Sequence, residues 1–319
     1  MVSVPALVRI AARASEVAAR QAAMVASLLE IQGVECEIVT VRTKGDRKRK
    51  PQSSLSQPPG FFTHELELAV SKKKVDCAIH SLDEVPLELR EGLALGAILE
   101  RDDPRDALVV NQVTQADDLA SLPAGSRVGT STILQRAQLC AHRRDLDPVD
   151  FRGGASDRLR KIERGQVHAG ILPASALLRL GVMRRITEYL ESPQWIPAVG
   201  QGAVAVEIRE DDSAMRDLVM TLNHDPTAVA VRAERAFVAA LDGAHEMPVS
   251  AVALPDAAGT LILHAFASDP EGRDVVRGSM PVDAESPEQS ARALVEEMRT
   301  RGLSSLLLAL RSSARERET

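Results

Sequence analysis

The chain has 319 residues, of which 45% are hydrophobic and only 2% aromatic, and it carries a formal net charge of −6 with a pI near 5.7. This length and apolar content suffice for two or three domains with aliphatic cores. The scarcity of aromatic rings argues against recognition of nucleic-acid bases by stacking, and the acidic balance argues against general binding of polyanions. An anionic ligand therefore needs a local cluster of basic residues.

No segment resembles a membrane anchor or an export signal. No apolar run reaches the roughly 18 residues that span a bilayer, and charged residues interrupt the N-terminal segment MVSVPALVRIAARASE. The cysteines Cys36, Cys77 and Cys140 are odd in number and lack metal-site spacing, so we interpret them as reduced, buried thiols. We therefore expect a cytoplasmic protein.

Short β-branched apolar runs alternate with longer helical patterns through the first two thirds of the chain, which is typical of α/β proteins. The predicted strands are Leu7–Ala11, Glu35–Val41, Val75–His80, Arg127–Gly129, His168–Leu172 and Val204–Arg209. The predicted helices include Ser15–Ile31, Phe62–Ser71 and Ile133–Arg143. Together they predict a mostly parallel, helix-covered sheet. Residues 43–59 lack periodicity and are rich in Lys, Ser, Gln and Pro, and we interpret them as a mobile loop.

The pattern changes beyond about residue 222. It predicts a helix over Thr227–Leu241, a turn at Asp242-Gly243, two strands around a turn at Pro255–Gly259, and a helix over Ser286–Arg301. We expect a separate small α+β domain.

Polar side chains follow two predicted strands, and ligands of open parallel sheets bind at the carboxyl ends of strands. Asp83 and Glu84 follow one strand, where capping by Ser81 or Asp83 is the structural alternative. Residues Thr130–Thr132 open a helix, where they form either an anion seat or an ordinary N-cap. The arginines near strand ends could hold carboxylates in bidentate fashion; they are Arg13, Arg152, Arg158 and Arg179.

No metal site is expected, because the seven histidines are dispersed. The chain also has no phosphate-binding glycine motif and no nucleophile elbow. The residues alone thus indicate an α/β protein that binds a small anionic ligand.

Several segments, in order along nearly the whole chain, resemble the porphobilinogen deaminase (hydroxymethylbilane synthase) family. They are VRIAARASEVAARQA, FFTHELELAVSKKKVDCAIHSLDEVPLEL, RDDPRDALV, RVGTSTILQRAQLCAHRRDL, FRGGASDRLRKIERG, ILPASALLRLG, PAVGQGAVAVEIR and AVRAERAFVAALDGAHEMPVSAVAL. The resemblance implies two domains like a type II periplasmic-binding-protein pair with two hinge crossings, and a small C-terminal α+β domain. It places domain 1 at residues 1–101 and 202–221, domain 2 at 105–197 and the C-terminal domain at 222–319, with the cofactor loop at 242–248.

The resemblance also implies a reaction in tetrapyrrole (heme) biosynthesis. The family joins four porphobilinogen molecules with loss of ammonia, on a dipyrromethane primer that a thioether links to one cysteine. Arg13 and Ser15 match its N-terminal substrate-side residues, and Thr130 and Ser131 match its hydroxyl pair at a helix start. The matches to arginines that hold acetate and propionate arms are Arg152, Arg158 and Arg179.

Other positions depart from the family pattern. His245 stands at the position of the cofactor cysteine, so a thioether is not expected there. Glu84 stands at the position of the catalytic aspartate, one methylene longer, and Asp83 stands at the position of a lysine. Residues 133–136 read Ile-Leu-Gln-Arg where the family has a Leu-Arg-Arg-Gln-like run, and residues 57–61 lose another cation. The basic residues within 44–50 could offset part of this loss, or form a solvated face.

Three hypotheses remain open. The first is a pseudoenzyme, impaired in catalysis, that binds a pyrrole or tetrapyrrole polyanion between its domains and carries no covalent cofactor. The second is an active hydroxymethylbilane synthase transferase with an atypically held primer. The third is a non-catalytic scaffold or regulatory protein. In each case we expect a monomer that binds neither nucleic acid nor membrane, and we favour the first.

Overall fold

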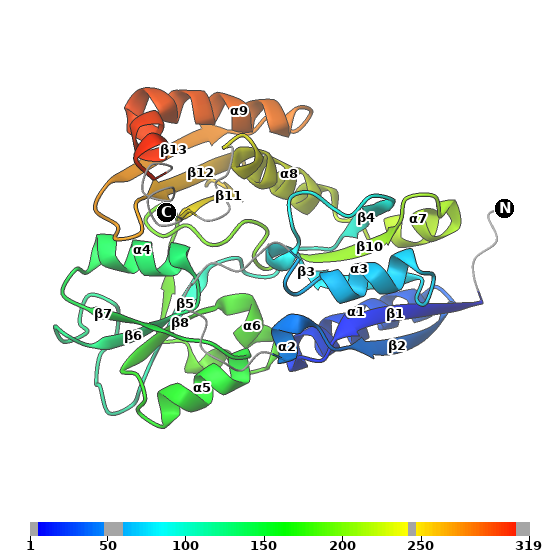
Figure 1. Ribbon diagram of the computed structural model, residues 1–319, viewed down its shortest axis with the longest axis horizontal. Helices are drawn as coiled ribbons and strands as arrows, with labels where there is room; N and C mark the ends of the chain where they lie inside the picture. Colours follow the sequence, from blue (N-terminus) through cyan, green and yellow to red (C-terminus); the bar gives the residue numbers. More distant parts are fainter. Residues whose placement is uncertain (1–5, 48–59, 242–246, 311–319) are drawn as a thin grey trace, which may run out of the picture.

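The computed structural model describes residues 6–47, 60–241 and 247–310, and Figure 1 shows two α/β lobes with a third unit beside them. The strands are β1 (Leu7–Arg13), β2 (Glu35–Val41), β3 (Cys77–Ser81), β4 (Leu93–Ile98), β5 (Asp106–Val110), β6 (Arg127–Thr130), β7 (Asp147–Asp150), β8 (Ala169–Pro173), β9 (Glu188–Leu190), β10 (Val204–Arg209), β11 (Val249–Pro255), β12 (Leu261–Ser268) and β13 (Val275–Pro281). The helices are α1 (Glu16–Ile31), α2 (Lys44–Arg47), α3 (His64–Ser71), α4 (Ile133–His142), α5 (Ala155–Glu163), α6 (Ala174–Arg179), α7 (Ser213–Met220), α8 (Asp225–Ala239) and α9 (Pro287–Met298). Short helical turns are η1 (Leu82–Glu84), η2 (Met183–Arg185) and the π-helical η4 (Arg299–Leu303).

The first lobe is built on a five-stranded sheet in the order β2-β1-β3-β10-β4. Strand β1 is parallel to β2 and β3, whereas β10 is antiparallel to β3 and β4. Because successive side chains of a strand point to opposite faces, Val8 and Ile10 pack with α1 and α7 while Ala11 packs with α3. Helices therefore cover both faces of this sheet.

The second lobe repeats the same pairing in the order β7-β6-β8-β5-β9. Strand β6 is parallel to β7 and β8, and β5 is antiparallel to β8 and β9. Helix α4 contributes Leu139 to the core on one face, and α5 and α6 contribute Leu159 and Leu177 to the core on the other.

Two segments cross between the lobes, one from β4 to β5 and one from β9 to β10. Gly202 lies in the returning segment with a φ of +88°, and a Cβ at this position would lie 2.6 Å from the carbonyl oxygen of Asp102 in the outgoing segment. Glycine is therefore the residue that lets the two crossings approach each other this closely.

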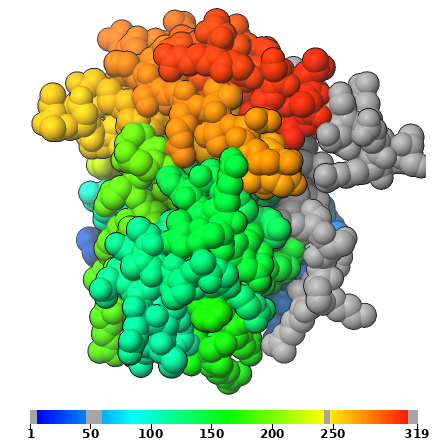
Figure 2. Space-filling model, turned by 90° about the vertical axis from the view of Figure 1, so that its left-hand side faces the viewer, coloured from blue at the N-terminus to red at the C-terminus, as the bar shows by residue number. Residues whose placement is uncertain are grey.

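The third unit is an antiparallel sheet, β11-β12-β13, with α8 and α9 packed on one face. Its other face contacts the second lobe through Phe266 and Ile196, and α8 contacts the first lobe through Val231 and Leu82. Figure 2 shows the second lobe (green) directly against this unit (orange). No helix in the described parts of the chain is long and apolar enough to cross a membrane.

The predicted fold class is confirmed: two lobes of type II periplasmic-binding-protein pairing, and a small α+β unit. All six predicted strands and the five predicted helices are present with small shifts of their ends. The mostly parallel arrangement is also confirmed, since four of the five strands in each lobe's sheet run in one direction. The exceptions are β10 and β5, which enter their sheets antiparallel after the crossings. The small sheet also has a third strand, β13, that the sequence pattern did not indicate.

The domain boundaries stay predictions. Within the expected loop over residues 43–59, residues Lys44–Arg47 form helix α2, and the remainder up to Pro59 lies outside the described residues. The predicted turn at Asp242-Gly243 also lies outside them.

Candidate functional site between the two lobes

The site begins where two neighbouring strands of the first lobe end. Strands β1 and β3 are parallel, with Ala11 opposite Ala78, so their carboxyl ends lie at the same edge of the sheet. Arg13 is the last residue of β1, and Glu84 closes the η1 turn that follows β3. Helix α1 of this lobe contacts α6 of the second lobe beside this edge (Figure 1).

Arg13 is held by two carboxylates and one aromatic ring. Its Nη1 contacts both carboxylate oxygens of Glu84, and its Nη2 donates to Oδ1 of Asp46 at 2.9 Å. The guanidinium lies 4.0 Å from the ring centroid of Phe62. Burial lowers the pKa of Arg13, but the Glu84 and Asp46 charges outweigh burial and raise it above its ordinary value. Burial likewise raises the pKa of Asp46, but the ion pair with Arg13 leaves it below its ordinary value.

Asp83 lies beside Glu84 and forms no ion pair with any of the described residues. Its side chain is reached by solvent, yet the surrounding protein reduces its hydration and Glu84 adds a like charge, which together raise its pKa to about 7. Arg179 partly opposes this rise. The alternative that Ser81 or Asp83 caps a helix is not supported, because no side-chain cap bond forms at η1 and the Ser81 hydroxyl instead accepts from Gln21 Nε2 at 2.7 Å.

The second lobe contributes Arg158, Ser131 and Thr130. Arg158 Nη1 donates to the Ser131 hydroxyl at 2.5 Å, and that hydroxyl donates to the carbonyl oxygen of Phe151 at 3.0 Å. The Nε of Arg158 and the Oγ1 of Thr130 are buried and have no hydrogen-bond partner among the described residues. Burial lowers the pKa of Arg158 to about 10, although Asp106, Asp83 and Glu84 favour its charged form.

Asp106, at the start of β5, is a buried acceptor for three side chains. It is 1% exposed and accepts hydrogen bonds from Trp195 Nε1 at 2.9 Å, from Gln135 Nε2 at 3.0 Å and from Gln201 Nε2 at 3.3 Å. Burial raises the pKa of its carboxyl, and these hydrogen bonds offset only part of that rise. Gln135, at a position where the resemblance implies a lost arginine, therefore serves as a donor to a buried acid.

The remaining predicted residues have structural partners. Thr132, not Thr130 or Ser131, is the N-cap of α4, since its hydroxyl accepts from Gln135 N. The Ser15 hydroxyl caps α1 by accepting from Ala18 N at 3.2 Å. Arg152 pairs with Asp150 at 2.8 Å.

Arg179 is engaged by the crossing segments. It pairs with Asp102 at 2.8 Å and donates to the Gly202 carbonyl oxygen at 2.7 Å. The structure thus gathers Arg13, Glu84, Asp83, Arg158, Ser131 and Thr130 where the lobes meet, and it gives Ser15, Arg152 and Arg179 local partners.

The sequence did not indicate three neighbours of the predicted residues. Asp46 and Phe62 contact Arg13, and Asp106 organises the second lobe. A usable signal existed for Asp106, because this acid lies in the segment RDDPRDALV at the start of an apolar run. No local pattern marks Asp46 or Phe62.

The repeated sheet pairing and the two crossings define a two-lobed fold of the type II periplasmic-binding-protein kind, extended by a third unit. The chain belongs to the porphobilinogen deaminase family: the family profile "Porphobilinogen deaminase, dipyromethane cofactor binding domain" matches residues 8–217. The porphobilinogen deaminase of Moorella thermoacetica is 38% identical over 96% of this chain and 97% of its own. That of Xanthomonas oryzae pv. oryzae is 39% identical over 95% of this chain and 99% of its own. Among solved structures, the methionine binding protein MetQ is similar with a TM-score of 0.44 at 12% identity, over 70% of this chain and 93% of that protein.

The family cofactor, dipyrromethane, requires a thiolate for its thioether, and the three cysteines of the chain do not offer one at this site. Cys77 is at the start of β3 and 0% exposed, and Cys36 is near the start of β2, so both lie away from the carboxyl ends of the strands. Cys140 lies in the last turn of α4, whose first turn faces the site. Burial raises the pKa of all three thiols. His245, which stands at the position of the family's cofactor cysteine and where no attachment is expected, lies outside the described residues.

Proposed function

We propose that this chain binds a small pyrrole carboxylate of tetrapyrrole biosynthesis between its two lobes and lacks the primer-dependent polymerisation of porphobilinogen. Membership of the porphobilinogen deaminase family supports the class of ligand. The carboxylates of a pyrrole supply acceptors of the kind that arginine and hydroxyl donors recognise.

One observation carries the binding half of the proposal. Of the four predicted arginines, Arg158 is the one without a carboxylate ion pair, and its buried Nε lacks a partner among the described residues, as does the buried Thr130 hydroxyl beside Ser131. Buried donors in native proteins are nearly always satisfied, so an unsatisfied pair marks a place where a ligand acceptor belongs. A ligand carboxylate there would accept from Arg158 and Thr130 together.

The charges around Arg158 and Thr130 support a ligand with few carboxylates. Arg13, Arg152 and Arg179 are already paired with acids of the chain, and Asp83 brings a further carboxyl to the site. A growing chain of pyrroles, which adds two carboxylates with every ring, is poorly matched to this balance.

Two features support the loss of turnover. A histidine at position 245 cannot form the thioether, and no described cysteine lies at the site. The Glu84 carboxylate is bound to Arg13, so the acid at the position of the family aspartate is an internal counterion. An acid displaced by about 1 Å loses on the order of 100-fold in rate.

Calorimetric titration of the full chain with porphobilinogen tests the binding half. We expect saturable binding that weakens about tenfold or more in Arg158→Gln, because a charge-assisted, bidentate contact is lost. Arg160→Gln is the matched control, since Arg160 lies on the same helix, is exposed and pairs with Asp157. Binding that is absent in the wild type, or equal in the wild type and Arg158→Gln, would refute the proposal.

A second candidate function is an active hydroxymethylbilane synthase. It is favoured by the 38% identity to a porphobilinogen deaminase over 96% of the chain and by the carboxylate kept at position 84. Intact-mass measurement of the purified protein, together with assay of hydroxymethylbilane from porphobilinogen, separates the two. A chain carrying the added mass of a dipyrromethane, or sustained product formation, would establish the second candidate. The third hypothesis, a scaffold without a ligand, is disfavoured by the unsatisfied donors at Arg158 and Thr130.

A further inference from the structure

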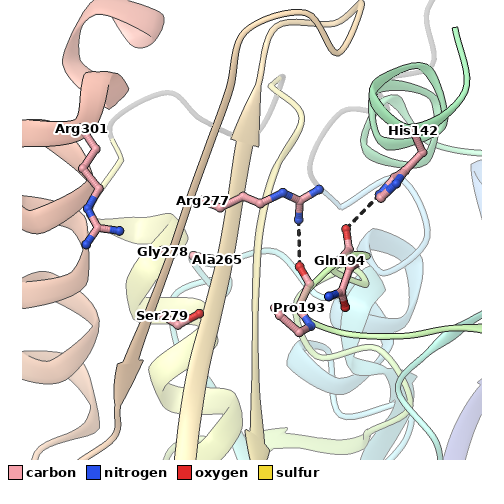
Figure 3. Close-up of a pocket in the computed structure, with 8 residues that line it drawn as sticks. All are labelled: His142, Pro193, Gln194, Ala265, Arg277, Gly278, Ser279 and Arg301. Atoms are coloured by element: carbon pink, nitrogen blue, oxygen red, sulfur yellow. Dashed lines mark hydrogen bonds between the residues drawn. The ribbon is translucent and has the colours of Figure 1, made fainter.

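A pocket with basic side chains in its lining lies outside the interlobe site, at the boundary of the second lobe and the third unit. It has a volume of about 440 Å³ and is lined by His142, Pro193, Gln194, Ala265, Arg277, Gly278, Ser279 and Arg301 (Figure 3). The lining includes two arginines and a histidine and no acidic residue. In a chain with a net charge of −6, this is a local concentration of basic groups.

Arg277 is the central cation of this pocket. Its guanidinium stacks on Phe266, 4.8 Å from the ring centroid, and its Nη1 donates to the carbonyl oxygen of Pro193 at 2.8 Å. The bond to Pro193 bridges the third unit and the second lobe (Figure 3). Together with the stacking on Phe266 within the third unit, it fixes the orientation of the guanidinium. Within the described ranges no carboxylate lies within ion-pair distance of Arg277, and burial lowers the pKa of this residue with no acid opposing it.

The other polar groups are also held in place. His142 bonds to the Gln194 carbonyl oxygen at 3.0 Å, and the Ser279 hydroxyl lies 2.8 Å from His264 Nδ1. Arg301 pairs with Glu297 on the preceding turn at 2.5 Å and is 57% exposed, so its guanidinium can swing toward a ligand. Arg277 offers a guanidinium of fixed orientation, and Arg301 offers a second one that can move. Guanidinium groups donate paired hydrogen bonds to the oxygens of phosphates and carboxylates, so the two arginines together suit an oxyanion.

We infer that this pocket binds a small oxyanion, a phosphate or carboxylate group, through Arg277 with assistance from Arg301. This site is separate from the proposed function and does not depend on it. The ligand would bridge the second lobe and the third unit, and so would stabilise their contact.

The single tryptophan of the chain gives a direct readout. Trp195 is 2% exposed, and its ring stacks with His142 at a centroid separation of 5.9 Å. Titration of the full chain with inorganic phosphate and, separately, with succinate is followed by Trp195 fluorescence at constant ionic strength. We expect saturation with at least one of the two; phosphate alone would indicate a phosphoryl ligand, and succinate alone a carboxylate ligand.

Variants decide whether the response belongs to this pocket. Arg277→Gln should weaken the response about tenfold or more, and Arg277→Lys should weaken it less because the charge is kept and only the fork is lost. Arg273→Gln removes an exposed cation already paired with Asp269 and Glu271, and should leave the response unchanged. Thermal unfolding of each variant confirms that it is folded. A linear response that sodium chloride reproduces, or equal saturation in the wild type and Arg277→Gln, would overturn the inference.

Discussion

Arg13 and Glu84 form an ion pair across the ends of two neighbouring parallel strands, with both oxygens of the carboxylate on one nitrogen of the guanidinium. The second nitrogen of Arg13 is bound to Asp46. Both terminal nitrogens of Arg13 are therefore engaged by acids of its own chain. The length of the Glu84 side chain controls how firmly this contact is made.

The first prediction follows from that length. Glu84→Asp shortens the side chain by one carbon–carbon bond, about 1.5 Å, so the carboxylate is drawn back from Arg13. We expect the affinity for porphobilinogen to rise about two- to tenfold, because the guanidinium regains free donors. Calorimetric titration measures the change. Glu88→Asp, an exposed position a few residues further along, is the control and should leave the affinity unchanged. Weaker binding in Glu84→Asp would mean that the Arg13–Glu84 pair helps to form the site.

The second prediction is that the affinity for porphobilinogen depends on pH through Asp83. Its pKa of about 7 means that it is mainly neutral at pH 6 and mainly ionised at pH 8. Because the ionised form repels a ligand carboxylate, we expect affinity for porphobilinogen to fall about two- to tenfold as the pH rises from about 6 to about 8. Titrations across this range measure the slope.

The variant Asp83→Asn isolates the cause of that slope. The amide cannot ionise, so we expect the affinity to be nearly independent of pH over the same range and close to the low-pH value of the wild type. An unchanged slope in Asp83→Asn would assign the pH dependence to another group.

The fold was predictable where local pattern and tertiary environment agree. Strands β2 and β10 have the bounds that their apolar runs predict. The sequence pattern did not indicate β4, β5, β7, β9 or β13. Two of these look unlike strands in isolation: β5 begins with the acid Asp106, and β7 is the four-residue sequence Asp-Pro-Val-Asp. They become strands because their neighbours β8 and β6 supply the backbone partners, and a sequence window cannot see those partners.

The candidate site was predictable where its residues follow strand ends. Ser131 and Arg158 were both singled out, and the structure bonds one to the other although they are 27 positions apart. The partners of Arg13 could not be found in this way. Asp46 contacts Arg13 from a short helix and Phe62 contacts it from the turn before α3, and no local sequence pattern at either residue indicates this contact.

Asp106 gives the third prediction. Asp106→Ala leaves the donors of Trp195, Gln135 and Gln201 without an acceptor in a buried environment, and we expect it to lower the free energy of unfolding by about 2–4 kcal/mol. Asp106→Asn keeps the shape and one acceptor oxygen, so it should lose less. Urea unfolding measures both, and Asp117→Ala at an exposed position is the control, with a change within about 0.5 kcal/mol.

The variant Asp106→Asn also tests in which direction the free energy of unfolding changes with pH. Because burial raises the pKa of Asp106 in the folded state, the folded chain holds this proton at pH values where the unfolded chain, with an ordinary pKa of about 4, has released it. The free energy of unfolding contributed by this group must therefore fall as the pH rises from about 4 through the raised pKa. Asp106→Asn should remove that part of the slope, and a steeper slope in the variant would contradict the assignment.

Glu234 gives the last prediction, which concerns the joint of all three units. It is 0% exposed on α8 and pairs with Arg101 in the outgoing crossing at 2.5 Å. It also accepts from Gly200 N in the returning crossing at 2.8 Å and from Ala253 N of β11 at 2.9 Å. Removing one member of a buried ion pair leaves the other charge buried without a partner. Glu234→Ala should therefore lower the free energy of unfolding by about 3–5 kcal/mol.

The matched control for Glu234 lies on the same helix. Arg232 pairs with Glu288 at 2.7 Å in an exposed setting, 51% and 37% accessible, and Arg232→Ala should lose about 1 kcal/mol or less. Since Glu234 bonds to both crossings and to β11, the loss in Glu234→Ala should also separate the unfolding of the third unit from that of the lobes. Calorimetric unfolding would show this as one transition in the wild type and two in the variant. A single transition in Glu234→Ala, shifted no more than in Arg232→Ala, would show that the apolar contacts of Leu82 with Val231 hold the units together without this ion pair.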